Sequence, residues 1–254
     1  MKFSATLTLI LGATLAMAST SAFAKDVVVF SAGAVKAALS VLAPVWETRS
    51  GDRLMITYAA AGDLRKKLAA GERADLLILP LENFAAVEQQ GLTDAASRRD
   101  LGSVGIGIAV KAGAALPDIS SEESLKRALL ATKSITYMDP NRGTSGKHFD
   151  EVVLTKLAIR DAVRAKAVLG EGGTIADKVA RGEVDMAIHQ MTEILPVAGV
   201  AIVGVLPPSL QKNTVYSGAV MKSATSAGEA AALLEFLVAA EGRKLFVSKG
   251  FAAP

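Results

Sequence analysis

The sequence contains no cysteine among its 254 residues. This absence excludes disulfides, thiol chemistry and the lipid-modified cysteine of a lipoprotein. Histidine is scarce, with only two residues. No cluster of His, Asp and Glu has the spacing of metal ligands, so we expect neither a metal nor an organic cofactor.

Aromatic residues are also few, at 5%, and charge of one sign does not dominate. The 28 Lys and Arg residues face 25 Asp and Glu residues, which gives a formal net charge of +3. Basic and acidic residues alternate, as in Arg98, Arg99 and Asp100. This mixture is typical of solvated helix faces and excludes a nucleic-acid-binding stripe.

Two motifs of common enzymes are incomplete. GTSGK at 143–147 resembles part of a P-loop, but the residue after Lys147 is His148 instead of Ser or Thr. The same stretch is one residue too short for the G-x-S-x-G turn of serine hydrolases. Neither nucleotide hydrolysis nor Ser/His/Asp hydrolysis is therefore indicated.

The longest apolar run near the start extends from Leu7 to Met17 and is too short for the roughly 20 residues of a membrane-spanning helix. Lys2 precedes it, and Ala22 and Ala24 follow in the pattern of a cleavage site. We predict a signal peptide over residues 1–24 in place of a membrane anchor. The expected product is a monomeric periplasmic protein.

What the chain does contain is a regular alternation of strand and helix patterns. Strands predicted at 27–30, 53–59 and 75–80 are followed by helices at 34–48, 63–70 and 82–90. Further strands are predicted at 104–110, 134–140, 185–190, 200–207 and 214–221, and further helices at 121–130, 149–159, 174–182 and, as one long helix, 227–251. The pattern predicts an α/β protein with parallel or mixed sheets flanked by helices.

Ligands of open α/β sheets bind beyond the carboxyl ends of strands, and three such ends carry small residues before a helix. They read FSAGAV at 30–35, YAAAGDL at 58–64 and DPNRGTSGKHF at 139–149. Backbone N–H groups exposed at a helix start attract anions. Each stretch taken alone is also ordinary turn chemistry, but three together favour an anion site.

Four segments resemble the periplasmic molybdate-binding proteins of ABC transporters: 27–51, GERADLLIL at 71–79, GEVDMAIHQMTEI at 182–194 and GRKLFVSKGF at 242–251. The resemblance covers essentially the whole chain after the signal peptide. It implies a type II periplasmic-binding-protein fold, with two lobes joined by two crossovers and closing over a small anion. Lobe one would comprise 25–107 plus 212–254, and lobe two 108–211. A membrane ABC permease would be the partner.

The side chains that hold molybdate in that family are missing from this sequence. The first two serine positions fall on Ala34 and on Ala61 or Gly62, and the tyrosine position falls on His189. Ser31 could replace the first serine after a shift in register. Molybdate therefore fits the resemblance poorly.

Positive charge is added where the family uses neutral donors. Arg142 and Lys147 flank Gly143, Thr144 and Ser145 at the expected helix start. A planar guanidinium pairs well with a carboxylate, and a polycarboxylate needs separated cationic partners. These residues predict capture of a small organic polyanion, most simply a di- or tricarboxylate. The alternative is that both cations are ordinary solvated loop charges.

The two histidines, His148 and His189, both fall in segments that the resemblance places beside the cleft. An imidazole suits proton transfer near neutral pH, although a strand histidine is often a packing residue. Acidic residues Asp63, Asp139 and Glu193 lie near the same strand ends.

One branch of the resembling family, the aconitate isomerases, interconverts cis- and trans-aconitate by an allylic proton shift. If that branch applies, Arg142, Lys147 and the backbone near Ser31, Ala61 and Thr144 would hold the carboxylates. Either histidine would then move the proton. Three functions stay open: capture of a polycarboxylate, isomerisation of aconitate, and reception of molybdate or a similar oxyanion.

Overall fold

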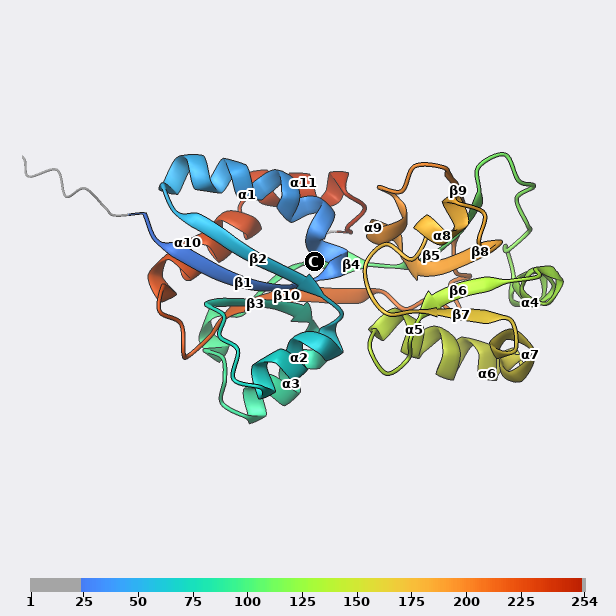
Figure 1. Ribbon diagram of the computed structural model, residues 1–254, viewed down its shortest axis with the longest axis horizontal. Helices are drawn as coiled ribbons and strands as arrows, with labels where there is room; N and C mark the ends of the chain where they lie inside the picture. Colours follow the sequence, from blue (N-terminus) through green and yellow to red (C-terminus); the bar gives the residue numbers. More distant parts are fainter. Residues whose placement is uncertain (1–23, 253–254) are drawn as a thin grey trace, which may run out of the picture.

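The computed structural model describes residues 24–252, so the signal peptide predicted over 1–24 lies, except for Ala24, outside the described residues. Two five-stranded sheets form the centres of two lobes placed side by side (Figure 1). No helix within 24–252 combines the length and the apolar character needed to cross a membrane.

The sheet of lobe one has the order β2-β1-β3-β10-β4. β1 pairs in parallel with both β2 and β3, and β10 runs antiparallel to β3 and β4. The strands are β1 (Asp26–Ala32), β2 (Arg53–Ala59), β3 (Leu76–Pro80), β4 (Arg99–Val104) and β10 (Thr214–Val220).

The sheet of lobe two has the order β7-β6-β8-β5-β9. β6 is parallel to β7 and β8, whereas β5 is antiparallel to β8 and β9. The strands are β5 (Ile106–Lys111), β6 (Ile135–Met138), β7 (Ala167–Gly170), β8 (Met186–Gln190) and β9 (Val200–Val205). The predicted α/β class with mixed sheets is confirmed.

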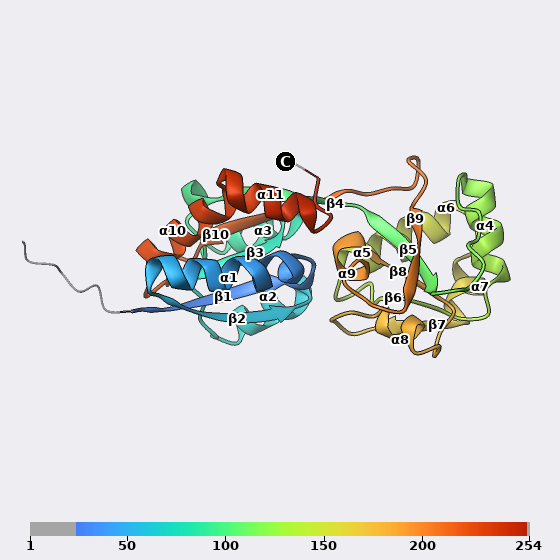
Figure 2. The ribbon, with the colours of Figure 1, turned by 90° about the horizontal axis from the view of Figure 1, so that it is seen from above.

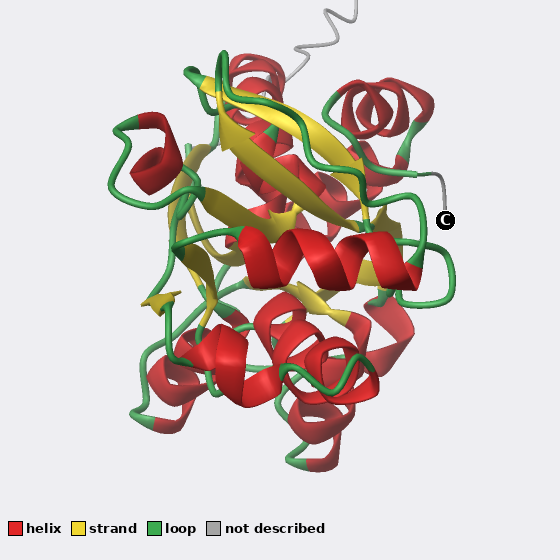
Figure 3. Cartoon of the chain, turned by 90° about the vertical axis from the view of Figure 1, so that its right-hand side faces the viewer, coloured by secondary structure: helices red, strands yellow, loops and turns green. Residues whose placement is uncertain are grey.

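Helices pack on both faces of each sheet (Figure 3). Those of lobe one are η1 (Gly33–Val35), α1 (Lys36–Ser50), α2 (Ala61–Ala69), α3 (Leu81–Gln89), η2 (Ala95–Ser97), α10 (Ala227–Val238) and α11 (Ala240–Ser248). Those of lobe two are α4 (Glu122–Ala131), α5 (Thr144–His148), the π-helical η3 (Phe149–Val153), α6 (Leu154–Lys156), α7 (Arg160–Arg164), α8 (Asp177–Ala180) and α9 (Met191–Ile194). Ser121 and Ser124 form a capping box at the start of α4.

The chain crosses between the sheets twice, at Gly105 between β4 and β5 and again over 206–213 between β9 and β10 (Figure 2). The side chain of Gln211 ties the two crossovers together. Its Oε1 accepts from the Ile106 N–H at 2.9 Å, and its Nε2 donates to the Ile106 carbonyl at 2.9 Å. The lobe boundaries predicted between residues 107 and 108 and between 211 and 212 stay a prediction. Both lie close to these crossings.

The single long helix predicted over 227–251 is wrong, because the structure has two helices there. α10 ends at Val238, and Ala239 is extended with ψ 167° before α11 begins. At this corner the backbone is so close that a Cβ on Gly242 would lie 2.2 Å from the Leu237 carbonyl oxygen. The continuous apolar pattern of 227–251 did not reveal a break that depends on packing.

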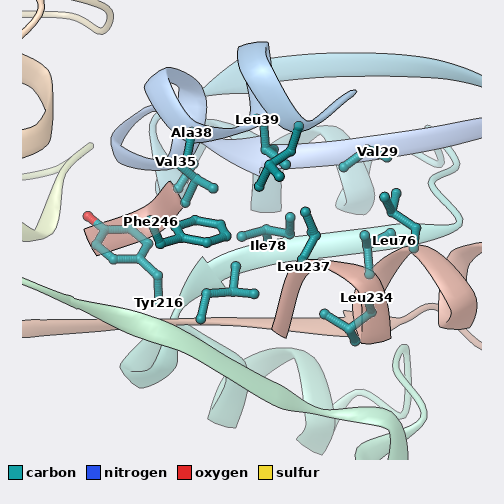
Figure 4. Packing of buried hydrophobic residues seen from close by; sticks show 14 of the residues in the cluster. Val29, Val35, Ala38, Leu39, Leu76, Ile78, Tyr216, Leu234, Leu237 and Phe246 are labelled. Carbon is teal, nitrogen blue, oxygen red and sulfur yellow. The ribbon is translucent and has the colours of Figure 1, made fainter. Parts of the chain in front are cut away.

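The main core of lobe one lies between its sheet and helices α1, α10 and α11 (Figure 4). Leu76 and Ile78 of β3 meet Leu39 of α1 and Leu237 of α10 there, all at most 1% exposed. Tyr216 of β10 lies at one end of this core. Its ring packs edge-on against Phe251 with centroids 6.0 Å apart, which fixes the side chain that reaches the cavity described next.

Candidate functional site

A cavity of about 380 Å³ lies between the lobes, at the carboxyl ends of the parallel strands. Lobe one contributes the segments after β1, β2 and β3, together with Tyr216. Lobe two contributes the segments after β6, β7 and β8. The topology thus brings six strand ends, far apart in the sequence, around one space.

Three helix starts line this cavity without a side-chain cap. They are the starts of η1, α2 and α5, whose N-cap residues are Ala32, Ala60 and Gly143. The first N–H groups of a helix have no partner within the helix, so small uncapped residues leave them available to an anion. The Gly62 N–H of α2 is an exception, because it donates to the Arg142 carbonyl at 3.2 Å. All three stretches chosen from the sequence therefore reach the same cavity.

His189, the penultimate residue of β8, stands in the cavity wall beside Glu193 of α9. Its ring is buried, and Nε2 lies 3.4 Å from Oε2 of Glu193 without forming a hydrogen bond. The other ring nitrogen, Nδ1, lies 3.4 Å from the Ser145 hydroxyl. A buried polar atom without a partner is costly, so the Nε2 position is suited to a ligand.

Burial gives these two groups unusual proton affinities. It raises the pKa of Glu193 to about 8, because no cation compensates the charged carboxylate. Burial also lowers the pKa of His189 to about 4, against a smaller opposing effect of the Gly173 backbone. At neutral pH the carboxyl is protonated and the imidazole is neutral, so the pair holds one exchangeable proton.

Two more buried polar atoms of the same wall lack hydrogen-bond partners among residues 24–252. They are Oε1 of Gln190 and Oγ1 of Thr192. Together with His189 Nε2 they come from the end of β8 and the start of α9. Unsatisfied polar atoms of residues that line a cavity indicate a polar ligand that supplies the missing partners.

Seven residues singled out from the sequence line the cavity: Ala34, Ala61, Gly143, Thr144, Ser145, His189 and the acidic candidate Glu193. Ser31 is fully buried behind the wall, and its hydroxyl donates to the Ala32 carbonyl at 3.2 Å. Gly62, Arg142, Lys147 and His148 line a neighbouring cleft between the lobes that also touches Ala61 and Thr144.

Two of the predicted residues in this neighbouring cleft, Arg142 and His148, have partners within the protein. Arg142 Nη2 lies 2.8 Å from Asp63 Oδ2 of lobe one, and Nη1 lies 3.4 Å from Glu171. The Nε2 atom of His148 lies 2.8 Å from the Leu210 carbonyl oxygen. Arg142 therefore links the lobes instead of pointing into the cavity.

Sequence reasoning missed three cavity residues, Lys36, Tyr58 and Tyr216. Burial raises the pKa of Tyr58 to about 12 and holds that of Tyr216 well above its usual value, so both hydroxyls stay protonated. Tyr58 opens the stretch 58–64 that the sequence indicated, although it was not named there as a ligand residue, and Lys36 directly follows the stretch 30–35. Nothing local marks Tyr216, which belongs to β10, the strand that returns from lobe two.

No group of three or more His, Asp and Glu residues in the part of the chain that the structure describes could hold a metal ion. The chemistry available to the cavity from these residues is hydrogen bonding, charge attraction and proton transfer. Glu193, His189 and the uncapped helix starts supply it.

Comparison with known proteins agrees with this architecture. The family model described as bacterial extracellular solute-binding protein matches residues 27–252. An aconitate isomerase from Pseudomonas sp is 32% identical over 252 residues, covering 96% of this chain and 95% of the relative. The molybdate-binding protein ModA of Escherichia coli K12 is 25% identical over 89% of this chain and 88% of its own.

Solved structures share the fold at lower identity. The periplasmic molybdate-binding protein of Azotobacter vinelandii has a TM-score of 0.76 at 17% identity, covering 90% of this chain and 99% of that one. The sulfate-binding protein SubI of Mycobacterium tuberculosis has a TM-score of 0.73 at 19% identity, covering 89% of this chain and 86% of that one. The chain belongs to the bacterial extracellular solute-binding protein family and has the type II fold of its molybdate-binding members.

Proposed function

We propose that the protein binds an aconitate-class tricarboxylate in the interlobe cavity and interconverts its cis and trans forms by moving one proton. The observation that carries this proposal is the buried pair of Glu193 and His189, 3.4 Å apart and holding one proton at neutral pH. The 32% identity to an aconitate isomerase along nearly the whole chain supports it.

The reaction requires a base and an acid and no change in oxidation state. His189 Nε2 takes a proton from the methylene carbon, so that a C–H bond breaks and an N–H bond forms. The electron pair spreads over the allylic carbons and their carboxylate. Glu193 then gives its carboxyl proton to the far allylic carbon, and the double bond forms at the new position with the other geometry.

After this step Glu193 and His189 return to their starting protonation states. The proton on His189 passes to the Glu193 carboxylate across the 3.4 Å between Nε2 and Oε2. A bound polyanion assists the first step, because its negative charge raises the pKa of the imidazole above the value in the empty cavity. Each component of such acid–base catalysis is worth about 10²- to 10⁴-fold in rate.

The carboxylates would be held by donors that line the cavity. In this proposal they are the backbone N–H groups near Ala34 and Ala61, the helix start at Gly143 to Ser145, and the Thr144 hydroxyl. Five residues chosen from the sequence have no contact with the ligand in this proposal, because they do not line the cavity. They are Ser31, Gly62, Arg142, Lys147 and His148. His148 has no role in proton transfer in this proposal.

The location and partner of the protein belong to the same proposal. The signal peptide inferred for residues 1–24 and the family description favour the periplasm. Other members of this family serve ABC transporters, so a membrane permease is a plausible partner for delivery of the acid.

A second candidate function is capture without conversion. It is favoured by the unpartnered atoms of Gln190 and Thr192, which suit ligand binding and have no place in the proton shift. In that case the protein would deliver a polycarboxylate to a permease. A molybdate receptor has less support, because Ala34, Ala61 and His189 replace the side chains expected to hold that anion.

One experiment separates these functions. Purified protein lacking residues 1–24 is incubated with trans-aconitate, and cis-aconitate is followed by chromatography. The same sample is tested for thermal stabilisation by aconitate, other carboxylates, sulfate and molybdate. We expect turnover. Thermal stabilisation by a carboxylate without turnover would establish capture. Stabilisation by molybdate alone would overturn both carboxylate functions.

Gly33 is expected to position Glu193, because a Cβ on Gly33 would lie 2.6 Å from Oε1 of Glu193. The variant Gly33→Ala would push the carboxyl away from its place beside His189. We expect kcat to fall by about 10- to 100-fold with KM changed much less, since a displacement of about 1 Å can cost that much.

The matched control is Gly228→Ala on α10, where an added Cβ meets nothing within 4 Å. It should leave both constants unchanged. An unchanged kcat in Gly33→Ala would contradict the positioning role. A fall in kcat accompanied by a large loss of thermal stability would indicate a merely structural role.

A further inference from the structure

Lys36 is the one Lys or Arg side chain in the described lining of the cavity. It is the first residue of α1, three positions after the Gly33 that contacts Glu193. Its ammonium lies 5.8 Å from the centre of the Tyr58 ring, an arrangement of the cation–π type. Lys36 and Tyr58 come from neighbouring strand ends of lobe one, those of β1 and β2.

The charge of Lys36 is not compensated by the protein. Among residues 24–252 no carboxylate lies within ion-pair distance of its ammonium. Three cations of the neighbouring cleft differ in this respect, because Arg142 pairs with Asp63, Lys147 with Glu151 and Lys212 with Glu82. Arg65, a fourth, has no ion pair among the described residues, but it lines that cleft and not the cavity. An uncompensated ammonium beside the cavity attracts an anion.

Tyr58 adds a hydroxyl to this positive charge. Because burial raises the pKa of Tyr58 to about 12, its phenol stays a hydrogen-bond donor at any physiological pH. The face of the same ring lies toward the ammonium. Ser40 follows Lys36 by one helical turn and also lines the cavity, so the three side chains share one wall.

We propose that Lys36 and Tyr58 form a carboxylate subsite that selects polycarboxylates over compact tetrahedral oxyanions. A ligand with separate carboxylates can contact this subsite with one group and the helix-start N–H groups with another. A single tetrahedral oxyanion held by the N–H groups leaves Lys36 without a partner. This inference rests on the proposed polycarboxylate ligand and names the residues that recognise it.

The test compares Lys36→Met and Lys36→Arg with the wild type. Tricarballylate, a saturated tricarboxylate that has no double bond to shift, serves as the binding probe in calorimetry, and molybdate is measured beside it. We expect Lys36→Met to weaken tricarballylate binding by about 10- to 100-fold, the usual size of a charged hydrogen bond. Lys36→Arg should keep most of the affinity, and weak molybdate binding should not change.

Kinetics give a second measurement on the same variants. The KM for trans-aconitate should rise in Lys36→Met by a similar factor, while kcat stays within about twofold because Lys36 takes no part in the proton shift. Lys244→Met, an exposed lysine of α11 without an ion pair in the described chain, is the matched control and should change nothing. Lys36 is itself exposed, so its replacement should leave the fold intact.

The outcomes separate this inference from the proposed function. Loss of tricarballylate affinity in Lys36→Met with no turnover in any variant would support the subsite and overturn the isomerase. Turnover in the wild type with unchanged affinity and KM in Lys36→Met would support the isomerase and overturn the subsite. Failure of the wild type to bind tricarballylate would overturn the subsite as well.

Discussion

Replacing Glu193 with Gln is expected to lower kcat by about 10²- to 10⁴-fold, because the side chain keeps its shape and loses the proton that it donates. The same change should raise the thermal stability of the empty protein. Wild-type Glu193 occupies a place where burial raises its pKa to about 8, so ionisation there costs about 1.4 kcal/mol for each unit of the shift. A neutral amide avoids this cost.

The stability gain should depend on pH in a defined direction. Folded Glu193 binds its proton up to about pH 8, whereas the unfolded carboxyl loses it near 4.5. Between these values the folded state binds more protons, so the wild type loses stability as pH rises, and Glu193→Gln does not. The melting temperatures should therefore diverge from pH 5 to pH 8, reaching a difference of at least about 2 °C.

Two measurements check this prediction: steady-state kinetics and thermal melting across pH 5 to 9. For the wild type, kcat/KM should fall above about pH 8, when Glu193 loses its proton, and below about pH 4, when His189 gains one. Glu123→Gln, on the exposed start of α4, is the matched control with normal activity. Full activity in Glu193→Gln would remove Glu193 from the mechanism.

Replacing Asp150 with Ala is expected to destabilise the protein by about 3 kcal/mol. Asp150 lies fully buried in η3 of lobe two. Its carboxylate accepts from the Tyr137 hydroxyl at 3.0 Å, from Arg160 Nη2 at 2.7 Å and from Arg164 Nε at 2.7 Å. Removing it leaves a buried phenol without its acceptor, whereas the two half-exposed arginines can turn to solvent.

Acid sensitivity provides a second readout for Asp150. Burial pushes its pKa upward, but hydrogen bonds from Arg164, Arg160 and Tyr137 outweigh burial and hold the pKa below 3.8. The stability that Asp150 contributes is therefore present above about pH 4 and is lost as pH falls through the folded pKa. In urea unfolding, Asp150→Ala should lose less of its free energy of unfolding between pH 5 and pH 3 than the wild type does.

Asp161→Ala, at an exposed position of α7, is the control for Asp150→Ala and should change stability by less than about 0.5 kcal/mol. Equal stability of Asp150→Ala and the wild type at pH 7 would show that the buried cluster contributes nothing. Ligand binding should survive in Asp150→Ala below its melting temperature, since Asp150 does not line the cavity.

Local sequence patterns were enough to find most of the elements around the site. The strands β1, β2 and β3 and their helices follow from runs of apolar residues and from helical spacing, both of which act over a few neighbouring residues. The same local chemistry located the three uncapped helix starts. β4 and β7 were missed because Arg99–Val104 and Ala167–Gly170 are short and lack a clear alternation.

What the sequence by itself determined is therefore the α/β class and the three strand ends that line the cavity, with His189 as a candidate for proton transfer. Only the tertiary structure decided which charges face the cavity. Arg142 meets Asp63 from the other lobe, and Lys36 is left without a partner. Glu193 acquires its raised pKa because α9 packs against Gly33, 160 positions away. Burial and charge pairing depend on contacts between distant segments, and no local sequence pattern contains these contacts.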